Sequence, residues 1–470
     1  HDAAGRVLST TRRIGAMVTT ESTEYDALGR VTKQVDVLGR ETITEYSEDG
    51  LTSIVTTPAG ATFITIQNTD GSTERIAGTG QREQVFVYDL SGNSERMTTK
   101  LSDGSVLSQS ITNGFGLILV DAVPNTLNGF IYTRYEYNAK GQMVKQYQDI
   151  GWNTPPTAPT LCEYEAFGNM VKQTTALSNA PTKDNSPMIE LSYAVESLED
   201  GVYSVLTKTS YSSAGTLVTR TQKQLISQLS SLVDKHIYSD VRGNESSSWT
   251  VLEANGKLLS YSTIPSSNIT AESTRVDGFT LSLTDHAGIT TTTSRSYTST
   301  GMITVRIDGR GNTMTVETDI AKRPISETDA LGNTSTTNYD VFHDRPSVET
   351  DAEGNISCYK YDIRGRKIAE WGTAIQPICF EYDDEDNIVS MSTFRAGEEN
   401  IITNPMARMD KDTTTWSFHP TTGLEICKTY ADHTTVKKSY DAYNRLATET
   451  DARENVKTHS YEHERGLLLS

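Results

Sequence analysis

Three side chains near the end of the sequence have a spacing that could bind zinc. His459, Glu462 and His463 fit the H-x-x-E-H pattern of inverted zinc proteases. That chemistry needs a helix, which places both imidazoles on one face with the glutamate beside the metal. Here the pattern overlaps Tyr461, which belongs to a turn unit described below, so the backbone should be extended and then turning. We therefore interpret these residues as members of a repeat.

An acidic run, Asp383-Asp-Glu-Asp386, is the second candidate. Clustered carboxylates suit hard cations such as calcium. However, Asp386 occupies a turn position where we expect a positive φ, and its neighbours extend that turn. We interpret the run as a solvated turn.

The four cysteines are the third candidate, and two of them allow a geometric argument. Cys358 and Cys379 each lie three residues before a recurring tyrosine. Equivalent positions two strands apart are separated by about 9.6 Å, which exceeds the ~7 Å Cα separation that a disulfide can bridge. We expect both to be unbridged. The sequence contains no C-x-x-C pair, G-x-S-x-G elbow or phosphate loop, so we predict no catalytic, cofactor-binding or metal-binding residues and no enzymatic activity.

The element that must position these residues is a short repeat. A tyrosine is followed four residues later by glycine at Tyr25/Gly29, Tyr88/Gly92, Tyr137/Gly141, Tyr164/Gly168, Tyr211/Gly215, Tyr297/Gly301 and Tyr361/Gly365. Elsewhere His343, Asp386 or Asn444 takes the glycine position. These residue types are enriched at positive φ, so the substitutions indicate a left-handed turn residue.

A second marker, Asp-x-x-Gly, lies between these units, as in Asp36–Gly39 and Asp351–Gly354. It is typical of a type I turn whose glycine closes a hairpin loop. The turn aspartates fall at 308, 319, 329, 340, 351 and 362, which leaves room for a strand of about six residues between turns. The sequence therefore predicts an all-β fold of tandem β-hairpins.

Irregular stretches interrupt the array near residues 149–160, 178–190 and 222–237. The first two contain prolines that cannot donate to a strand ladder. The third places Leu225, Leu229, Leu232, Val233 and His236 at helix-like spacing, and both a short helix and serine-rich hairpins remain open there. None of them requires a separate domain, so we expect one continuous array over residues 1–470.

The pattern resembles the YD-repeat, or RHS-repeat, family. The matching stretches are Tyr-Asp-Ala-Leu-Gly-Arg-Val (25–31), Tyr-Asp-Ile-Arg-Gly-Arg-Lys (361–367) and Tyr-Asp-Ala-Tyr-Asn-Arg-Leu (440–446). The family includes bacterial Rhs polymorphic toxins, the B and C components of insecticidal toxin complexes, and teneurin-like surface proteins. The resemblance implies a β-ribbon that spirals into a partial hollow shell, often around a C-terminal toxin domain.

Geometry independently favours a coiled ribbon. At 10–11 residues per strand the chain supplies roughly 40 strands, and at ~4.8 Å spacing they would extend on the order of 200 Å. Open twisted sheets rarely exceed about ten strands without curling. If all the strands formed one ring, it would be about 60 Å across and one strand high, so we expect about one turn of wall.

Composition excludes some classes of function. The 42 Lys and Arg against 61 Asp and Glu give a net charge of −19, which argues against nucleic-acid binding. The sequence contains no run of about 18 apolar residues, which is the length needed to span a membrane. Both ends fall within the repeat, so we expect an internal piece of a longer polypeptide.

These observations lead to one hypothesis and one alternative. The chain would be a non-enzymatic shell segment, without cofactors, that encapsulates its own C-terminal toxin or effector domain or joins another shell component. The resemblance implies a secreted or cell-surface location. The alternative is a surface adhesion protein whose aromatic residues, including Trp152, Trp249, Trp371 and Trp416, bind glycans or another cell-surface ligand.

Overall fold

In the computed structural model the chain forms one sheet of 38 antiparallel strands. The structure describes residues 1–151, 156–178, 181–212, 217–228, 232–240, 242–253, 257–264, 267–276, 279–394, 405–407, 411–463 and 465–469. The single short helix among them is the 3₁₀ turn η1, Pro405–Ala407. The all-β prediction is confirmed.

The first half of the ribbon comprises β1 Ser9–Ile14, β2 Met17–Tyr25, β3 Val31–Val35, β4 Glu41–Tyr46, β5 Thr52–Thr56, β6 Thr62–Gln67, β7 Thr73–Ala77, β8 Gln84–Ser91, β9 Ser94–Lys100, β10 Val106–Asn113, β11 Ile118–Pro124, β12 Phe130–Tyr137, β13 Met143–Asp149, β14 Thr160–Tyr164, β15 Met170–Thr175, β16 Met188–Leu198, β17 Gly201–Tyr211, β18 Leu217–Gln228 and β19 Leu232–Ser239. The second half comprises β20 Glu245–Leu252, β21 Leu258–Ile264, β22 Ser267–Val276, β23 Phe279–Thr284, β24 Thr290–Tyr297, β25 Gly301–Ile307, β26 Thr313–Asp319, β27 Pro324–Thr328, β28 Thr334–Tyr339, β29 Pro346–Thr350, β30 Ile356–Tyr361, β31 Lys367–Gly372, β32 Ile378–Tyr382, β33 Ile388–Phe394, β34 Lys411–Phe418, β35 Glu425–Thr429, β36 Thr435–Tyr440, β37 Leu446–Thr450 and β38 Val456–Thr458.

Each strand pairs with the next one along the chain, so the ribbon has two edges made of turns. Turns after even-numbered strands lie along one edge, which we call the tyrosine edge because many of those strands end at a repeat tyrosine, as β30 does at Tyr361. Turns after odd-numbered strands lie along the other edge. We call it the asparagine edge, after turns such as Asp329–Asn333 and Asp351–Asn355.

The turn after β30 shows how the repeat residues build a hairpin. The N–H of Asp362 donates to the carbonyl of Arg366, and Gly365 closes the turn at φ 76°. The Asp362 Oδ1 accepts the N–H groups of Arg364 and Arg366, and its Oδ2 accepts the Arg366 Nε at 2.7 Å. The aspartate therefore satisfies turn donors and holds the arginine. Equivalent backbone closure occurs at five of the six regularly spaced aspartates, 308, 319, 329, 351 and 362, whereas the turn at Asp340 closes one residue later.

Two of the three expected non-glycine turn residues adopt positive φ. Asp386 has φ 66° and Asn444 has φ 60°. The expectation for His343 is wrong, because its turn is one residue longer and closes from the Asp340 N–H to the Arg345 carbonyl. The extra residue removes the need for a left-handed conformation at His343.

Neighbouring units are joined by a contact between an arginine and the following repeat tyrosine. The Arg366 guanidinium lies 4.8 Å from the centre of the Tyr382 ring. The Tyr382 hydroxyl donates to the carbonyl of Lys367, the residue after that arginine, at 2.7 Å. The same pair of contacts recurs at Arg323 with Tyr339, Arg345 with Tyr361, and Arg445 with Tyr461. The motif thus connects neighbouring hairpins at these four places.

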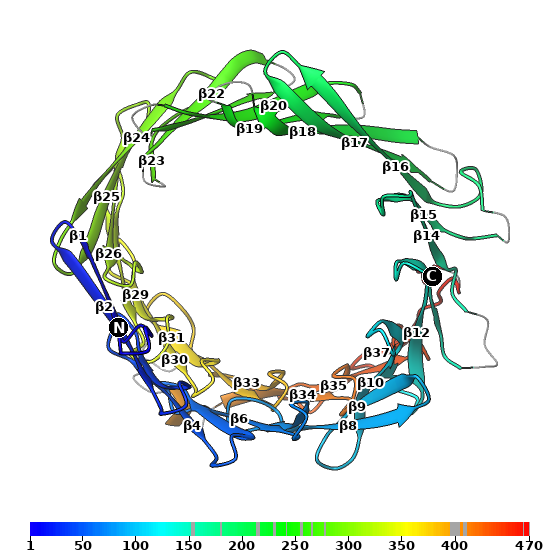
Figure 1. Ribbon diagram of the computed structural model, residues 1–470. Helices are drawn as coiled ribbons and strands as arrows, with labels where there is room; N and C mark the ends of the chain where they lie inside the picture. The colour runs from blue at the N-terminus through cyan, green and yellow to red at the C-terminus, as the bar shows by residue number, and fades with distance from the viewer. Residues whose placement is uncertain are drawn as a thin grey trace.

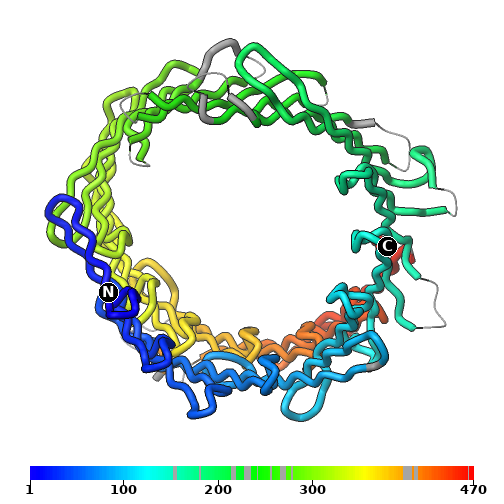
Figure 2. Tube along the Cα trace, viewed as in Figure 1, coloured from blue at the N-terminus to red at the C-terminus, as the bar shows by residue number. Residues whose placement is uncertain are grey.

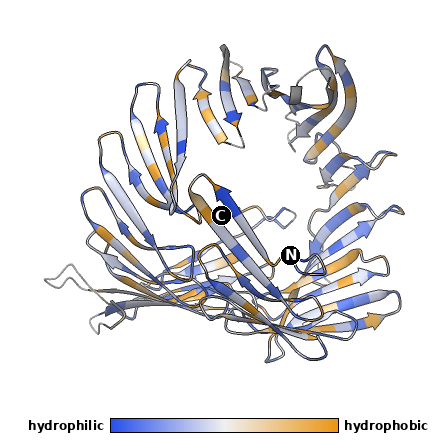
Figure 3. Ribbon diagram, turned by 60° about the vertical axis from the view of Figure 1, so that its left-hand side comes forward, coloured by the Kyte–Doolittle hydropathy of each residue, from blue (hydrophilic) through white to orange (hydrophobic). Residues whose placement is uncertain are grey.

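The ribbon has little hydrophobic core. Hydrophobic and hydrophilic residues are interleaved along the strands (Figure 3). The accessible surface of 27693 Å² greatly exceeds the roughly 17,000 Å² expected for a compact protein of 51.7 kDa. Among the described residues the largest fully buried side chain is Tyr203, whose pKa is raised to about 12 by burial and by its hydrogen bond to Asp200. A continuous strand ladder, rather than a thick core, holds this fold.

The ribbon follows a circular path and then overlaps itself (Figures 1 and 2). Arg40, between β3 and β4, contacts Asp344, between β28 and β29. Asn125, between β11 and β12, contacts the turn between β36 and β37. Both contacts join turns 25 strands apart, which implies a circumference of about 120 Å before strand tilt is considered. The expected single wide turn is wrong: 38 strands complete about one and a half narrower turns.

The structure describes parts of the irregular stretches. Residues 222–228 belong to β18 and residues 232–237 to β19, and these strands pair antiparallel. The helical alternative is therefore wrong for the described part of 222–237, and Leu229 lies outside the described residues. Trp152 also lies outside the described residues.

Candidate functional site

The seam, where the second turn of the ribbon overlies the first, brings together residues about 300 positions apart. The tyrosine edge of the second turn meets the asparagine edge of the first turn along it. The seam contacts include hydrogen bonds and ion pairs involving side chains, as at Arg40, Arg82, Asn125, Arg364 and Asn444. Strand pairing holds the ribbon, whereas side chains hold one turn against another.

The best-defined ionic contact in the seam centres on Asp344. Its Oδ1 and Oδ2 accept the two terminal nitrogens of Arg40 from the first turn, at 3.0 and 3.1 Å. Its Oδ1 also accepts Arg323 of the second turn at 3.1 Å. The hydrogen bond from Arg40 is the main reason why the pKa of Asp344 is lowered. Asp344 is therefore a charged bridge between turns.

The acidic run 383–386 also lies at the seam, and carboxylates of the run form ion pairs with arginines. The Asp386 Oδ1 accepts Arg366 Nη1 at 2.8 Å, while Glu385 pairs with Arg82 of the first turn. Asp383 is the turn aspartate, and its Oδ1 accepts the N–H groups of Glu385 and Asn387. Ion pairing and turn formation thus account for most of the run.

Asn444 makes a reciprocal amide contact across the seam. Its Nδ2 donates to the carbonyl of Pro124 at 3.0 Å, and its Oδ1 accepts the N–H of Thr126 at 3.1 Å. In return, Asn125 Nδ2 donates to the carbonyl of Ala442 at 3.0 Å. The left-handed turn that Asn444 occupies directs its amide at the other turn.

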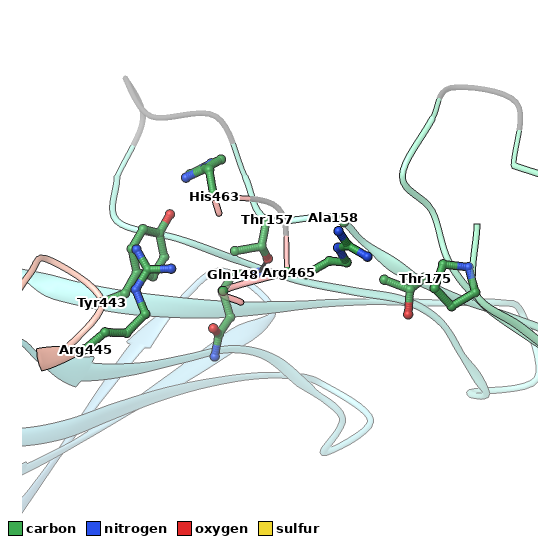
Figure 4. A pocket seen from close by; sticks show the side chains of 10 residues that line it. Gln148, Thr157, Ala158, Thr175, Tyr443, Arg445, His463 and Arg465 are labelled. Atoms are coloured by element: carbon green, nitrogen blue, oxygen red, sulfur yellow. Dashed lines mark hydrogen bonds between the residues drawn. The ribbon is translucent and has the colours of Figure 1, made fainter. Parts of the chain in front are cut away.

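A hollow of about 500 Å³ lies further along the seam (Figure 4). The first turn contributes Gln148, Thr157, Ala158, Thr175 and Pro187 to its lining, and the second contributes Tyr443, Arg445, His463, Arg465 and Gly466. Both guanidinium groups already face carboxylates, because Arg445 pairs with Asp441 and Arg465 with Glu462. The hollow therefore offers polar contacts of nearly balanced charge.

Three buried side-chain atoms without a hydrogen-bond partner in the described structure all belong to seam turns. They are Thr126 Oγ1, His343 Nε2 and Tyr443 Oη. Burial raises the pKa of the Tyr443 hydroxyl. Hydrogen bonding is therefore less complete in the seam than in the strand ladder on either side of it. Unpaired buried polar atoms are costly, so these three atoms destabilise the seam.

The three residues of the zinc-like pattern, His459, Glu462 and His463, make contacts with different partners. The N–H of His459 donates to the carbonyl of Ala447 at 2.8 Å. Glu462 binds Arg465 through both carboxylate oxygens, and His463 packs edge-on against Tyr443. In the part of the chain that is described, no three His, Cys, Asp or Glu residues could hold a metal ion.

All four cysteines are free thiols. Cys358 in β30 and Cys379 in β32 are separated by β31, in agreement with the prediction that the two are unbridged. Burial raises the pKa of the thiols of Cys162, Cys358 and Cys379, which lowers their thiolate fraction.

The sequence did not reveal the seam. Arg40, Arg82 and Asn125 lie in turns whose partners are more than 300 residues away. One signal was present: Asp36 has arginine four residues later, where other asparagine-edge turns, at Asp308, Asp329, Asp351 and Asp451, have asparagine. That departure marked a position where a longer, charged side chain was needed.

The RHS Repeat family model matches residues 25–62. This stretch runs from the end of β2 to the start of β6 and includes Tyr-Asp-Ala-Leu-Gly-Arg-Val at 25–31. The match confirms the resemblance to the RHS-repeat family. No curated protein matches the chain.

Solved toxin-complex structures are similar to the chain. A Tc holotoxin pore from Photorhabdus luminescens has a TM-score of 0.48 and 13% identity, covering 96% of this chain and 24% of that chain. TcdB2–TccC3 without its hypervariable C-terminal region has a TM-score of 0.48 and 13% identity, covering 97% of this chain and 30% of that one. The chain thus spans 24% and 30% of the length of these two chains.

Proposed function

We propose that this chain is a non-enzymatic wall segment of an exported RHS-repeat protein. Its role is to enclose a polypeptide, either a C-terminal toxin or effector domain of its own or a component of a toxin assembly. The observation that carries the proposal is the ribbon itself, whose turns stack around a common axis (Figure 1). Such a wall serves to separate an interior from its surroundings.

The chemistry of the repeats supports a structural role. The turn aspartate, its glycine, the arginine and the next tyrosine are all occupied in holding backbone or one another. The RHS repeat at residues 25–62 supports the same role and, with it, a secreted or cell-surface location. No helix among the described residues is long and apolar enough to cross a membrane.

Adhesion through aromatic residues is the second candidate. Trp249 in β20 stacks on Tyr261 in β21, with ring centres 5.3 Å apart and planes 20° apart. Stacked aromatic faces are a common platform for sugars. The other described tryptophans, Trp371 in β31 and Trp416 in β34, lie on different strands.

Electron cryomicroscopy of the assembly purified from its natural producer tests the proposal. We expect protein density inside the ring that this chain does not account for. In parallel, the isolated chain is applied to a glycan array, where we expect no binding. An empty interior together with glycan binding that Trp249→Ala abolishes would replace enclosure by adhesion.

A further inference from the structure

The two faces of the ribbon differ in chemistry between β16 and β25. Successive residues of a strand point to opposite faces, and residues paired directly across a ladder share a face. The register of these strands connects Tyr193 in β16, through Tyr238 in β19 and Leu283 in β23, to Arg306 in β25. We call the face that these four residues share the basic face.

Charged residues are divided unequally between the two faces. In the described part of these strands the basic face carries five cations and one carboxylate, which are Lys208, Arg220, Arg275, Arg295, Arg306 and Asp234. The opposite face carries two cations and four carboxylates, which are Lys223, Lys235, Glu190, Glu196, Glu245 and Glu272. The basic face therefore has a net positive charge in a protein whose net charge is −19.

Three guanidinium groups on the basic face have no acidic partner among the described residues. Arg275, Arg295 and Arg306 are exposed, and within that part of the chain they form no hydrogen bond or ion pair. On the opposite face, by contrast, Lys223 pairs with Glu196 at 2.7 Å. The basic face consequently offers cations to a ligand, whereas cations of the opposite face are already neutralised.

Exposed apolar side chains lie among these cations. Along β23 the apolar residues Phe279, Leu281 and Leu283 are 36%, 43% and 43% exposed, while the polar residues between them are half-buried. Val195 in β16, on the same face as Tyr193, is 67% exposed. The Arg295 guanidinium lies 3.4 Å from the centre of the Phe279 ring. A face that exposes apolar and basic groups together has the features of a binding surface.

The exposure of the basic face does not depend on the edges of the ribbon. Turns of the spiral meet through their edges, as Arg40 and Asp344 do. A turn above or below therefore covers an edge and leaves the two faces of the ribbon uncovered (Figure 2).

An acidic polypeptide offers a partner to each kind of group on this face. Its carboxylates pair with the guanidinium groups, its apolar side chains cover Leu281 and Leu283, and its backbone amides reach exposed side chains such as Gln222 and Gln224. A nucleic acid would leave the apolar side chains uncovered. A lipid bilayer would bury the glutamine amides without hydrogen-bond partners, which is costly.

We propose that the basic face binds an acidic polypeptide segment that also carries apolar side chains. Charge complementarity selects the segment, and burial of the apolar side chains adds to its affinity. The inference concerns this face alone and does not require that the ring encloses its partner.

Fluorescence anisotropy of the intact chain with a labelled peptide tests the proposal. The probe is a peptide of about 12 residues that alternates glutamate and leucine, and we expect saturable binding that weakens at about 0.5 M NaCl. Two matched peptides, lysine alternating with leucine and glutamate alternating with serine, should each bind at least about tenfold more weakly.

Variants of the chain locate the binding surface. Arg295→Gln with Arg306→Gln should weaken binding by about tenfold, and Leu281→Ser with Leu283→Ser should do the same. All four positions are exposed, so circular dichroism should show an unchanged fold. Arg12→Gln with Arg13→Gln, at exposed positions in β1, changes the net charge by the same amount and should leave binding unchanged.

Three outcomes would overturn the proposal. The first is a wild-type chain that does not bind the glutamate–leucine peptide. The second is an equal loss of binding in the β1 control, which would show that only the net charge of the protein matters. The third is tighter binding of a double-stranded DNA oligonucleotide or of phosphatidylglycerol vesicles than of the peptide, which would assign the face to a different class of partner.

Discussion

At the scale of single residues, the repeat motif divides its work between neighbouring units. Asp362 builds its own turn and holds Arg366, while Arg366 stacks on Tyr382 of the next unit. The Tyr382 hydroxyl then returns a hydrogen bond to Lys367. One short motif therefore stabilises both a turn and the junction between hairpins, which explains why its members recur together.

Tyr382→Phe tests the junction. The substitution removes the hydroxyl bond to Lys367 but keeps the ring under Arg366, so we expect a loss of about 1 kcal/mol, or roughly fivefold faster amide exchange in residues 362–382. Tyr382→Leu should cost a further ~0.5–1 kcal/mol because the cation–π contact is also lost. Hydrogen exchange measures both. Equal effects of Phe and Leu would show that the hydroxyl carries the whole junction.

At the scale of the element, the hairpin turn sets a backbone requirement rather than a residue requirement. Gly332, Lys322 and Glu454 all have positive φ, at 86°, 66° and 63°. A Cβ atom at Gly332 would meet no atom within 4 Å. The only obstacle to a side chain at this position is therefore the strain of the left-handed backbone conformation. The turn therefore tolerates other residues, at a cost that the rest of the hairpin offsets.

Two substitutions at the same turn position should have opposite signs. Gly332→Ala should destabilise its hairpin by about 1 kcal/mol, because alanine is strained in the left-handed region. Glu454→Asn should stabilise its hairpin by about 0.5 kcal/mol, since asparagine tolerates that region better than glutamate. Local hydrogen exchange or thermal unfolding would reveal the difference. Destabilisation by both variants would contradict the backbone argument.

At the scale of the whole molecule, two kinds of interaction hold the protein. Backbone ladders run continuously from β1 to β38, whereas the seam depends on side chains such as Asp344 and Asn444. Stability in arrays of this kind is approximately a sum of nearest-neighbour terms. Turns of the spiral should consequently separate without loss of the strands.

Asn444→Gly tests the separation of these two interactions. Glycine keeps the left-handed turn, so the hairpin should remain, but both bonds from the Asn444 amide to the first turn are lost. We expect the Thr126 amide to exchange about tenfold faster, while the Tyr443 and Arg445 amides, bonded to Asp441, stay protected. Glu454→Gly, at the same turn position on the opposite edge, is the control. Loss of protection throughout 441–445 would show that the seam and the hairpin form a single unit.

The sequence by itself determined the local structure. Hairpin turns depend on residues four or five positions apart, such as Asp362, Gly365 and Arg366, so their chemistry is written within one repeat. The tyrosine spacing likewise indicated an array of hairpins, and the large number of strands indicated a coiled ribbon. His343 was misjudged because a one-residue insertion changes a turn without changing the tyrosine pattern.

Only the tertiary structure decided how tightly the ribbon coils and which turns meet. Twist accumulates in small steps over 25 strands, so the register between Arg40 and Asp344, or between Asn125 and Asn444, depends on the sum of many local angles. No repeat encodes that sum. For this reason the acidic run 383–386 could be recognised as a turn from its residues, whereas its contact with Arg82 became evident only in the folded spiral.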